Sequence, residues 1–397
     1  MTEQVYILEG ARTPFGAFGQ SFKQTGAAEL GLISAKEALR RAAVEPERIE
    51  QVFYGNVIHS SKDASYLARH IALRAGIPVQ TPAMTVNRLC GSGMQAVISA
   101  AQSIMLGEAG LCLAGGAENM SQAPHADFAS RFGMKLGHVQ LEDMLLNTLT
   151  DSYIGCGMGM TAENIASRYA IGREVQDEYT VISHRRAVEA TDSGALPEEI
   201  VAVNVAGRGG STTEVRHDEL IRRDTSTDQL AKLRPAFLRE GGTVTAGNAS
   251  GINDGAASLV LAGESQLDGR TPLARIVSWG IAGVEPDVMG LGPVPAARIA
   301  LARSGLSVAD MDLTEINEAF AVQVLAVERE LGLDRERMNV NGGAIAIGHP
   351  VGASGARILL TLAYELRRRS KRYGLAALCV GGGQGVAVVI ENTSPAR

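Results

Sequence analysis

The fold of this 397-residue chain is decided by residues 84–119, MTVNRLCGSGMQAVISAAQSIMLGEAGLCLAGGAEN. A strand-like run leads into a glycine-flanked turn, an uncharged helix-like segment and an apolar run. Residues 338–385 repeat this order, from MNVN through the helix-like SGARILLTLAYEL to LCVGGGQG. Each copy is a β–turn–α–β unit, which normally builds parallel sheet with helices packed on it. The sequence therefore predicts an α/β fold made of two similar halves, with Cys112 and Cys379 in the same register of the repeat.

The region between the two copies has a different composition. It is rich in charged residues and methionine, with a predicted helix at 174–190 and polar, loop-like sequence around 207–226. We interpret residues 121–248 as a loop domain inserted into the first half and lying over it, a common place for substrate-binding surface. The first half then comprises residues 1–120 with 249–270, and the second half comprises residues 271–397.

The bulk composition excludes several classes of protein. With 45% hydrophobic and 20% charged residues, the chain is of the ordinary globular type, and its net charge of −6 gives no support to a nucleic-acid partner. The longest uncharged run, 89–107, contains Ser, Gln and Gly, so we expect a buried helix and no membrane span. The amino terminus lacks a basic region before an apolar run, and the four cysteines form no C-x-x-C pair. We therefore expect a protein of a reducing compartment, the cytoplasm.

Cys90 is the first candidate for chemistry. It lies between a strand-like run and a helix predicted to begin near Ser92. The unpaired N–H groups and the positive dipole end of that helix would lower the pKa of the thiol, and Gly91 and Gly93 would let a substrate approach the backbone. A buried structural cysteine is the alternative, and position alone does not decide between the two.

Two further candidates belong to the second copy. Small residues precede His349, so a thin loop would present its imidazole as a base, although a hydrogen-bonded loop histidine is the alternative. Cys379 ends an apolar strand before three glycines, and the carboxyl ends of parallel strands are where sites form. Asn317 and Glu318 form a polar pair in an apolar setting, which is equally typical of a helix cap.

Two features bear on whether the ligand carries phosphate. A basic cluster favours a phosphorylated ligand, whereas the glycine runs match no phosphate-binding motif. Arg222, Arg223, Lys232 and Arg234 would attract a phosphorylated ligand or form a solvated basic face. The run GGGQG (381–385) does not match the dinucleotide-binding pattern, and no Walker A sequence is present. We therefore reject nucleotide-cofactor and NTPase functions.

Taken together, these residues resemble the thiolases, the family of acetyl-CoA acetyltransferases and 3-ketoacyl-CoA thiolases. The matching blocks span the chain in family order: VNRLCGSGMQA, GGAENMSQAPH, MGMTAEN, KLRPAF, TAGNASGINDGAA, NEAFA, NVNGGAIAIGHPVGASGAR and CVGGGQG. The resemblance implies two similar α/β halves in a five-layered αβαβα core with an inserted loop domain. It also implies a homodimer or homotetramer, acyl-CoA thioesters as substrates, and no metal or redox cofactor.

The resemblance also implies a role for each candidate. Cys90 would carry the acyl group as a thioester, His349 would activate it, and Cys379 would act as the acid and base at the α-carbon. Asn317 would hold a water that forms one oxyanion hole with His349, and the backbone N–H groups of Cys90 and Gly381 would form the second. The implied coenzyme A contacts are Arg222, Ala236, Phe237, Ala246 and Ser250, together with Leu149 and Met158.

One departure from the family pattern leaves the substrate open. Short-chain biosynthetic thiolases often have a histidine where this chain has Gly157, and Cys156 beside it is expected to be a bystander. The main hypothesis is an acetoacetyl-CoA thiolase, and the close alternative is a degradative thiolase of broader chain length. An inactive acyl-CoA-binding protein is disfavoured because all four candidate site residues are present. A decarboxylative ketoacyl synthase is disfavoured because a second cysteine, Cys379, takes the acid/base place.

Overall fold

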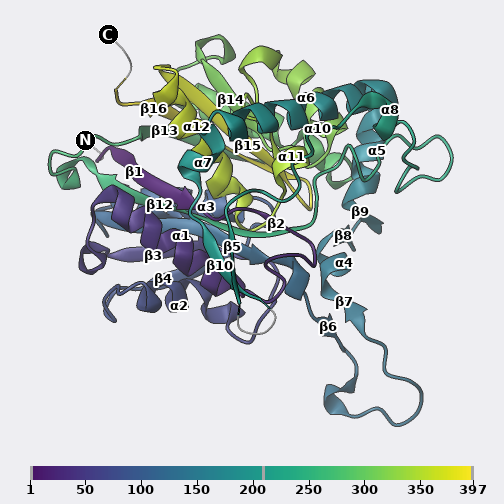
Figure 1. Ribbon diagram of the computed structural model, residues 1–397, viewed down its shortest axis with the longest axis horizontal. Coiled ribbons are helices and arrows are strands. Elements are labelled where there is room, and N and C mark those ends of the chain that lie inside the picture. Colours follow the sequence, from purple (N-terminus) through teal and green to yellow (C-terminus); the bar gives the residue numbers. More distant parts are fainter. Residues whose placement is uncertain (1–2, 208–210, 395–397) are drawn as a thin grey trace.

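A ten-stranded sheet runs through the part of the chain that the computed structural model describes, residues 3–207 and 211–394 (Figure 1). The strand order is β14-β15-β16-β13-β1-β12-β5-β3-β4, and β2 pairs with β12. These strands are β1 (Val5–Arg12), β2 (Gly16–Ala17), β3 (Gln51–Gly55), β4 (Ala83–Val86), β5 (Leu111–Asn119), β12 (Asn253–Gly263), β13 (Ala274–Gly283), β14 (Leu313–Ile316), β15 (Tyr373–Val380) and β16 (Gln384–Asn392). β1 joins the two halves, because it pairs antiparallel with both β12 and β13.

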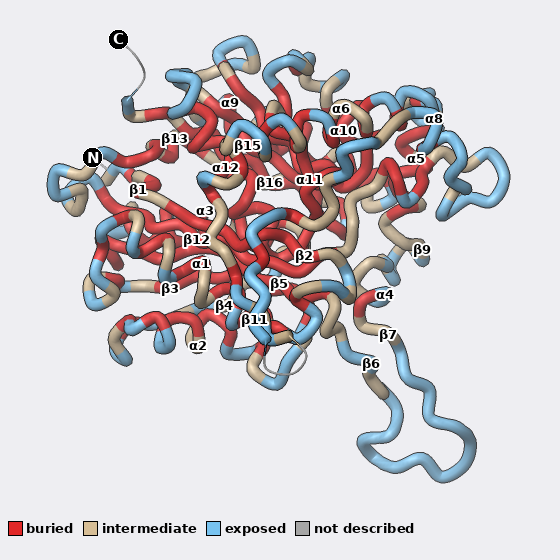
Figure 2. Tube along the Cα trace, viewed as in Figure 1, coloured by how far each residue is buried: buried red, intermediate tan, exposed pale blue. Residues whose placement is uncertain are grey.

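Helices cover both outer faces of the sheet halves and fill the space between them. The principal helices are α1 (Ala27–Ala42), α2 (Leu67–Arg74), α3 (Ser92–Met105), α9 (Pro293–Ser304), α10 (Ala321–Leu331), α11 (Ala344–Ile347) and α12 (Ser354–Arg368). One apolar cluster joins α1 and α2 to the first-half strands, and another joins α9 and α10 to the second-half strands. A third cluster contains α3, α12 and the inner faces of both halves. This is the predicted αβαβα layering, with a buried centre that Figure 2 shows in red.

The two central helices approach each other backbone to backbone at their N-terminal ends. A Cβ on Gly93 would lie 2.8 Å from the carbonyl oxygen of Gly352, and one on Gly355 would lie 2.4 Å from the backbone nitrogen of Met94. Only glycine permits this approach, since real Cβ atoms essentially never come so close to backbone atoms. The turn before α3 and the segment before α12 are thereby brought together.

The repeat predicted from the sequence is present, with two corrections. β4, α3 and β5 form the first copy as predicted, but residues 338–342 form only isolated bridges where the second copy was expected to have a strand. The register assigned to the two cysteines is also wrong. Cys112 is the second residue of β5 and faces the central helices, whereas Cys379 is next to last in β15 and faces the outer layer. The glycine turn at 381–383 begins two residues after Cys379 and ends β15.

The inserted segment lies over both halves, and not over the first half alone as predicted. It contains β6 (His125–Ala126), β7 (Glu142–Asp143), α4 (Met144–Thr148), β8 (Thr150–Asp151), β9 (Cys156–Gly157), α5 (Met158–Tyr169), α6 (Arg173–Asp192), α7 (Ala195–Glu199), β10 (Val203–Ala206), β11 (Thr212–Val215) and α8 (Thr227–Leu230). α5 and α6 pack against α10 of the second half, while the β10–β11 hairpin contributes Val203 and Val215 to the core of the first half. The loop between β6 and β7 projects from the body of the molecule (Figures 1 and 2). The domain boundaries remain a prediction.

Several expectations about the uncharged run and the cysteines can be compared with the structure. The run 89–107 contains α3, a buried helix as predicted. Among the described residues, no helix has both the length and the apolar character that a membrane crossing requires. All four cysteines are free thiols, and no group of three or more His, Cys, Asp or Glu side chains in the described ranges is arranged to hold a metal ion. Met1 and Thr2 of the predicted leaderless amino terminus lie outside those ranges.

Candidate active site

Cys90 lies in a tight turn that its neighbours hold in an unusual backbone conformation. Leu89 has a φ of 45°, in the left-handed region that non-glycine residues rarely adopt. Ser92 donates a hydrogen bond from its hydroxyl to the Leu89 carbonyl at 2.7 Å and so closes the turn. A Cβ on Gly91 would lie 2.9 Å from Val380 Cγ2, so this glycine lets the Cys90 turn pack against the end of β15. Such strained residues cluster at functional sites, where surrounding structure holds them.

The predicted lowering of the Cys90 pKa is wrong. Burial raises the pKa of the Cys90 thiol to about 11, although backbone N–H groups of Gly381 and of Cys90 itself act in the lowering direction. Loss of water around the thiolate thus outweighs the favourable contribution of the local backbone dipoles. At neutral pH the resting side chain is therefore a thiol and needs a base to become a nucleophile.

His349 has the hydrogen-bonding pattern that such a base requires. It follows α11 and precedes α12, and the residue as a whole is 6% exposed. Ser354 Oγ lies 2.6 Å from His349 Nδ1 and itself donates to the Pro350 carbonyl at 2.9 Å. Because the hydroxyl proton is already directed at that carbonyl, Ser354 accepts from an Nδ1–H group. This fixes the tautomer and leaves Nε2 with its lone pair available.

The environment of His349 also keeps its imidazole neutral. Burial, and then the positive charge of Arg357, lowers the pKa of His349 to about 3. Nε2 has no hydrogen-bond partner among the residues that the structure describes. His349 and Cys90 line the same pocket, so the unoccupied nitrogen belongs to the site that contains the thiol. A buried neutral imidazole with a free nitrogen can accept the Cys90 proton.

Asn317 directly follows β14, and Cys379 lies in the neighbouring parallel strand β15 of the second half. β14 and β15 pair in parallel, and the Asn317 backbone nitrogen donates to Ala377 at 2.9 Å. Asn317 Nδ2 lies 3.5 Å from His349 Nδ1, and its Oδ1 has no partner within the described part of the chain. Burial, followed by the nearby Cys90 sulfur, raises the pKa of Cys379 well above its ordinary value. The structure thus brings Asn317 beside His349 and Cys379 beside Cys90, while the roles assigned to them remain predictions.

The predicted coenzyme A contacts divide into two groups. The Cys90 pocket has a volume of about 400 Å³. It is lined mainly by apolar groups and includes six of the seven predicted contacts: Leu149, Met158, Ala236, Phe237, Ala246 and Ser250. Phe237 packs edge-on against Phe320, with ring centroids 6.3 Å apart, and forms part of the wall. A Cβ on Gly159 would lie 2.2 Å from the Phe237 ring, so this glycine makes room for it.

Arg222, the seventh predicted contact, does not line this pocket. Its side chain belongs to an exposed segment, and its backbone nitrogen donates to His184 Nδ1 at 3.2 Å. The neighbouring Arg223 forms a bidentate ion pair with Asp192, at 2.6 and 2.9 Å, so its charge is already compensated. Of the predicted basic cluster, Arg222, Lys232 and Arg234 remain candidates for a phosphate of the ligand.

Gly157 lies in the wall of the Cys90 pocket, at the point where the sequence departs from short-chain relatives. It precedes α5, and a Cβ there would meet only the Leu149 carbonyl oxygen, at 3.5 Å. A side chain at this position would therefore occupy open space without a clash. Cys156 next to it is half-buried and does not line the pocket, and its role as a bystander stays a prediction.

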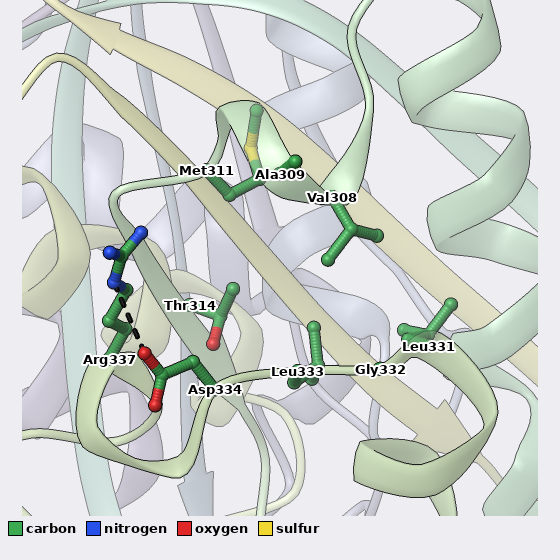
Figure 3. Close-up of a pocket in the computed structure, with 9 residues that line it drawn as sticks. All are labelled: Val308, Ala309, Met311, Thr314, Leu331, Gly332, Leu333, Asp334 and Arg337. Carbon is green, nitrogen blue, oxygen red and sulfur yellow. Dashed lines mark ion pairs between the residues drawn. The ribbon is translucent and has the colours of Figure 1, made fainter.

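A second hollow lies elsewhere in the second half (Figure 3). Its volume is about 320 Å³, and it shares no lining residue with the Cys90 pocket. Apolar side chains such as Met311 and Leu333 form its wall, beside an ion pair of 3.3 Å between Asp334 and Arg337. No cysteine or histidine lines it, so it offers neither a thiol nor an imidazole for acyl transfer.

Sequence reasoning missed the residues that orient His349. Ser354 fixes its tautomer, and Asn253 accepts a hydrogen bond from the His349 backbone nitrogen at 3.0 Å. Asn253 is 96 residues away in the chain, so no local pattern could have indicated the contact. The sequence could have indicated the contact with Ser354, because Ser354 lies at the N-terminal end of α12, five residues after His349.

Comparisons with known proteins agree with this geometry. The chain matches the family models "Thiolase, N-terminal domain" over residues 5–265 and "Thiolase, C-terminal domain" over residues 270–392. It is 48% identical over 393 residues to "Beta-ketothiolase BktB" of Cupriavidus necator, covering 98% of this chain and 100% of that protein. It is 49% identical over 390 residues to "Acetyl-CoA acetyltransferase" of the same organism, covering 98% and 99% of the two chains.

Solved structures support the same assignment. The structure of human mitochondrial 3-ketoacyl-CoA thiolase superposes with a TM-score of 0.96 at 49% identity, covering 99% of each chain. The Bacillus anthracis acetyl-CoA acetyltransferase superposes with a TM-score of 0.96 at 45% identity, covering 98% of this chain and 99% of that one. Family models, curated relatives and solved structures thus match the whole length of the chain, and this chain belongs to the thiolase family of acyltransferases.

Proposed function

We propose that this thiolase catalyses the reversible condensation of two acetyl-CoA molecules to acetoacetyl-CoA and coenzyme A, through an acyl-Cys90 intermediate. The observation that carries the proposal is the pairing of Cys90 with a neutral His349 in one mainly apolar pocket. The wall of that pocket contains six of the residues expected to contact coenzyme A. Among curated relatives, "Acetyl-CoA acetyltransferase" names this class of activity.

In the first half-reaction, His349 Nε2 takes the proton of the Cys90 thiol, and the sulfur attacks the thioester carbonyl of acetyl-CoA. The C–S bond to coenzyme A then breaks, and its thiolate leaves with the proton of Cys379, while His349 keeps the Cys90 proton on Nε2. Thiolate suits this step because it is both a good nucleophile and a good leaving group. We propose that the N–H groups of Gly381 and Cys90 stabilise the developing oxyanion, and their effect on the Cys90 sulfur supports this assignment.

In the second half-reaction, the Cys379 thiolate left by the first removes an α-proton from a second acetyl-CoA. The resulting carbanion attacks acetyl-Cys90, a carbon–carbon bond forms, and the Cys90 thiolate leaves and takes back its proton from His349. The negative charge on the thioester oxygen needs a second set of donors, for which we propose the Nε2–H group that His349 gains from Cys90 and a water held by Asn317. The unpaired Oδ1 of Asn317, beside His349, supports this assignment because it is free to accept a hydrogen bond from that water.

The length of the acyl chain distinguishes the two candidate substrates. Gly157 is the feature of the pocket that favours a longer acyl group. The space beside Gly157 could accept a longer or branched 3-ketoacyl chain, and one relative is named "3-ketoacyl-CoA thiolase, mitochondrial". The test is a thiolysis profile over 3-ketoacyl-CoAs from four to sixteen carbons. Our main proposal expects kcat/KM to be highest with acetoacetyl-CoA. A four-carbon rate far below the long-chain rates would contradict it and establish the broader thiolase as the correct assignment.

We also propose a homodimer or homotetramer in the cytoplasm. Strand β4 lies at the edge of the sheet with Met84 47% exposed, and the loop between β6 and β7 exposes Phe132 and Leu136. Unpaired strand edges and exposed apolar side chains of this kind are typical of subunit contacts. Light scattering on the purified protein would test the assembly, with a monomer as the contradicting result, and cell fractionation would test the compartment.

A further inference from the structure

The segment that carries His349, residues 343–352, is held at both ends and in its middle by side chains from other parts of the fold. Near its start, Ile345 donates its backbone N–H to Glu318 at 3.1 Å. In its middle, His349 donates its backbone N–H to Asn253 Oδ1 at 3.0 Å. At its end, Gly352 donates its backbone N–H to Glu118 at 3.0 Å. Each of these acceptors is fully buried.

Glycines in the segment lie where these side chains reach its backbone. A Cβ on Gly343 would lie 2.3 Å from Glu318 Cδ, and one on Gly352 would lie 2.6 Å from Glu118 Oε2. A Cβ on Gly348 would lie 2.5 Å from Asn253 Cγ. Three glycines thus make room for three separate contacts, which gives a physical reason for the small residues around His349.

Each carboxylate accepts hydrogen bonds from four donors in the described part of the chain. Glu118 accepts from Asn56 Nδ2 at 2.9 Å and from the backbone nitrogens of Val57, Ile58 and Gly352 at 3.0 to 3.1 Å. Burial raises the pKa of Glu118 to about 8, and the three backbone N–H groups act in the opposite direction. A protonated carboxyl would direct its own hydrogen at one of four donors, so the ionised form fits this cage better.

Glu318 has an equivalent cage built by the second half and the inserted segment. It accepts from Tyr179 Oη at 2.8 Å, Asn339 Nδ2 at 3.0 Å, Ser183 Oγ at 2.7 Å and the Ile345 nitrogen. Ser183 Oγ in turn accepts from the Gly343 nitrogen at 3.1 Å. Glu318 thereby fixes two N–H groups at the start of the His349 segment, one directly and one through Ser183.

We propose that Glu118 and Glu318 are positioning residues that hold His349 against Cys90 from the two halves of the molecule. Glu118 is next to last in β5 of the first half, the half that carries Cys90. Glu318 directly follows Asn317 after β14 of the second half. Neither carboxylate lines the Cys90 pocket, so each positions His349 through the backbone of its segment. The negative charge of Glu118 also raises the pKa of the Cys90 thiol, so loss of that charge alone would speed alkylation of Cys90, and slower alkylation reports a displaced His349. The proposal rests on the role of His349 as the base in the proposed function.

The expected effect follows from how sensitive proton transfer is to distance. A base must lie within hydrogen-bond reach of the proton it removes, and a displacement of about 1 Å can cost about 100-fold in rate. Replacing either Glu by Gln keeps the shape but adds an NH₂ group facing donors, so at least one backbone contact of the cage is lost. The substitutions Glu118→Gln and Glu318→Gln should therefore move His349 without removing it.

The test measures alkylation of individual cysteines by iodoacetamide in the full-length protein, followed by peptide mass spectrometry. We expect Glu118→Gln and Glu318→Gln each to slow alkylation of Cys90 by about 10- to 100-fold, toward the rate of His349→Asn. The half-buried Cys156 is an internal reference whose rate should stay unchanged, and continued protection of the buried Cys112 reports an intact fold. In thiolysis, kcat should fall while KM for coenzyme A stays nearly constant.

Two sets of variants separate positioning from general destabilisation. Gly343→Ala and Gly352→Ala displace the same carboxylates without changing them and should reproduce the slow alkylation of Cys90. Gly26→Ala is the matched control, because a Cβ there meets nothing within 4 Å and its φ is −61°. Glu163→Gln is the second control. Glu163 is a buried carboxylate that accepts from the backbone of Thr243 and Val244, and it should leave the Cys90 rate unchanged.

Wild-type alkylation rates of Cys90 in folded Glu118→Gln and Glu318→Gln proteins would overturn the proposal. The same slowing in Glu163→Gln would also overturn it, because the effect would then follow from the loss of any buried carboxylate. Failure of the proposed function looks different. In that case wild-type protein would show no thiolysis with any 3-ketoacyl-CoA, while the difference in Cys90 alkylation between variants would persist.

Discussion

The turn before α3 and the segment before α12 each hold one reactive side chain at the pocket, but different contacts fix the two. The Cys90 turn is short and closes on itself through the hydroxyl of Ser92. The His349 segment is longer, contains α11, and is fixed by Glu118, Asn253 and Glu318 from distant parts of the chain. A nucleophile needs access to substrate, so a self-contained turn at the pocket suffices. A base needs a fixed orientation, and here that orientation comes from three buried acceptors.

Strands β5 and β15 each contain one cysteine, and the two cysteines differ in their position along the strand. Cys112 is the second residue of β5 and packs in the core, while Cys379 is next to last in β15, two residues before the glycine turn. The position next to last in β5 is taken by Glu118, the carboxylate that contacts the His349 segment. Reactive or positioning groups thus occupy the carboxyl ends of the two strands, where sites in α/β sheets form. A cysteine at the other end of such a strand is structural.

The largest expected effect comes from removing the nucleophile. Cys90→Ala should lower kcat for thiolysis by roughly 10⁴-fold or more, because no thioester intermediate can form. Circular dichroism and thermal unfolding should stay close to wild type, since the turn is closed by Ser92 and not by the thiol. Substantial thiolysis by this variant would refute the assignment of Cys90.

The comparison of the two strand cysteines predicts the next effect. Cys379→Ala should lower carbon–carbon bond formation by about 10²- to 10⁴-fold while transfer of acetyl to Cys90 persists. Cys112→Ala should leave both half-reactions intact and cost about 1–2 kcal/mol of unfolding free energy, because it leaves a small cavity in the core. Single-turnover assays of each half-reaction measure the difference. Equal loss of both half-reactions in Cys379→Ala would count against its role as the second base.

A smaller effect is expected from the hydroxyl that fixes the tautomer of His349. Ser354→Ala removes the acceptor of the Nδ1–H group and should lower the rate of Cys90 acylation by about 10-fold. Ser103→Ala, which removes another buried hydroxyl at the far end of α3, is the control and should leave this rate unchanged. Pre-steady-state acylation kinetics provide the measurement, and equal rates for the two variants would contradict the assigned tautomer.

The effect that is smallest at neutral pH is a pH dependence of stability. The pKa of His349 is about 3 in the fold and near 6.5 when exposed, so between these values only the unfolded chain binds the proton. The contribution of His349 to unfolding free energy should fall as pH is lowered from 6.5 toward 3, by up to about 1.4 kcal/mol per pH unit. Relative to wild type, His349→Asn should therefore become less destabilised by acid. Parallel denaturant curves for both proteins at pH 7, 6 and 5 would test this, and a constant difference between them would contradict the lowered pKa.

The sequence was sufficient to predict the layers, α3, α6 and the pairing of Cys90 with His349, because each depends on local pattern or on blocks that the thiolases share. It did not predict the raised pKa of Cys90, since local dipoles are visible in the sequence and burial by a distant half is not. The equivalence of Cys112 and Cys379 was also wrong, because the repeat aligned the two Leu-Cys pairs and not the ends of the two strands.

The supports of the base were the least predictable part of the site. Glu318 could be interpreted equally well as a helix cap, and Glu118 and Asn253 act on a segment more than 90 residues away. Their roles depend on the approach of α3 to α12, which is set by tertiary packing at Gly93 and Gly355. The glycines at 343, 348 and 352 were the available signal, since each marks a place where another group reaches the backbone.

The most direct test of the central claim is the mass of the acyl-enzyme. Cys379→Ala protein incubated with acetyl-CoA should stop after the first half-reaction and gain one acetyl group, which peptide mapping should locate on Cys90. The double variant Cys90→Ala/Cys379→Ala should gain none. Acetylation of a different residue, or no acetylation of the folded Cys379→Ala protein while the wild-type enzyme is active, would contradict the account in which the first copy supplies the nucleophile and the second supplies its base.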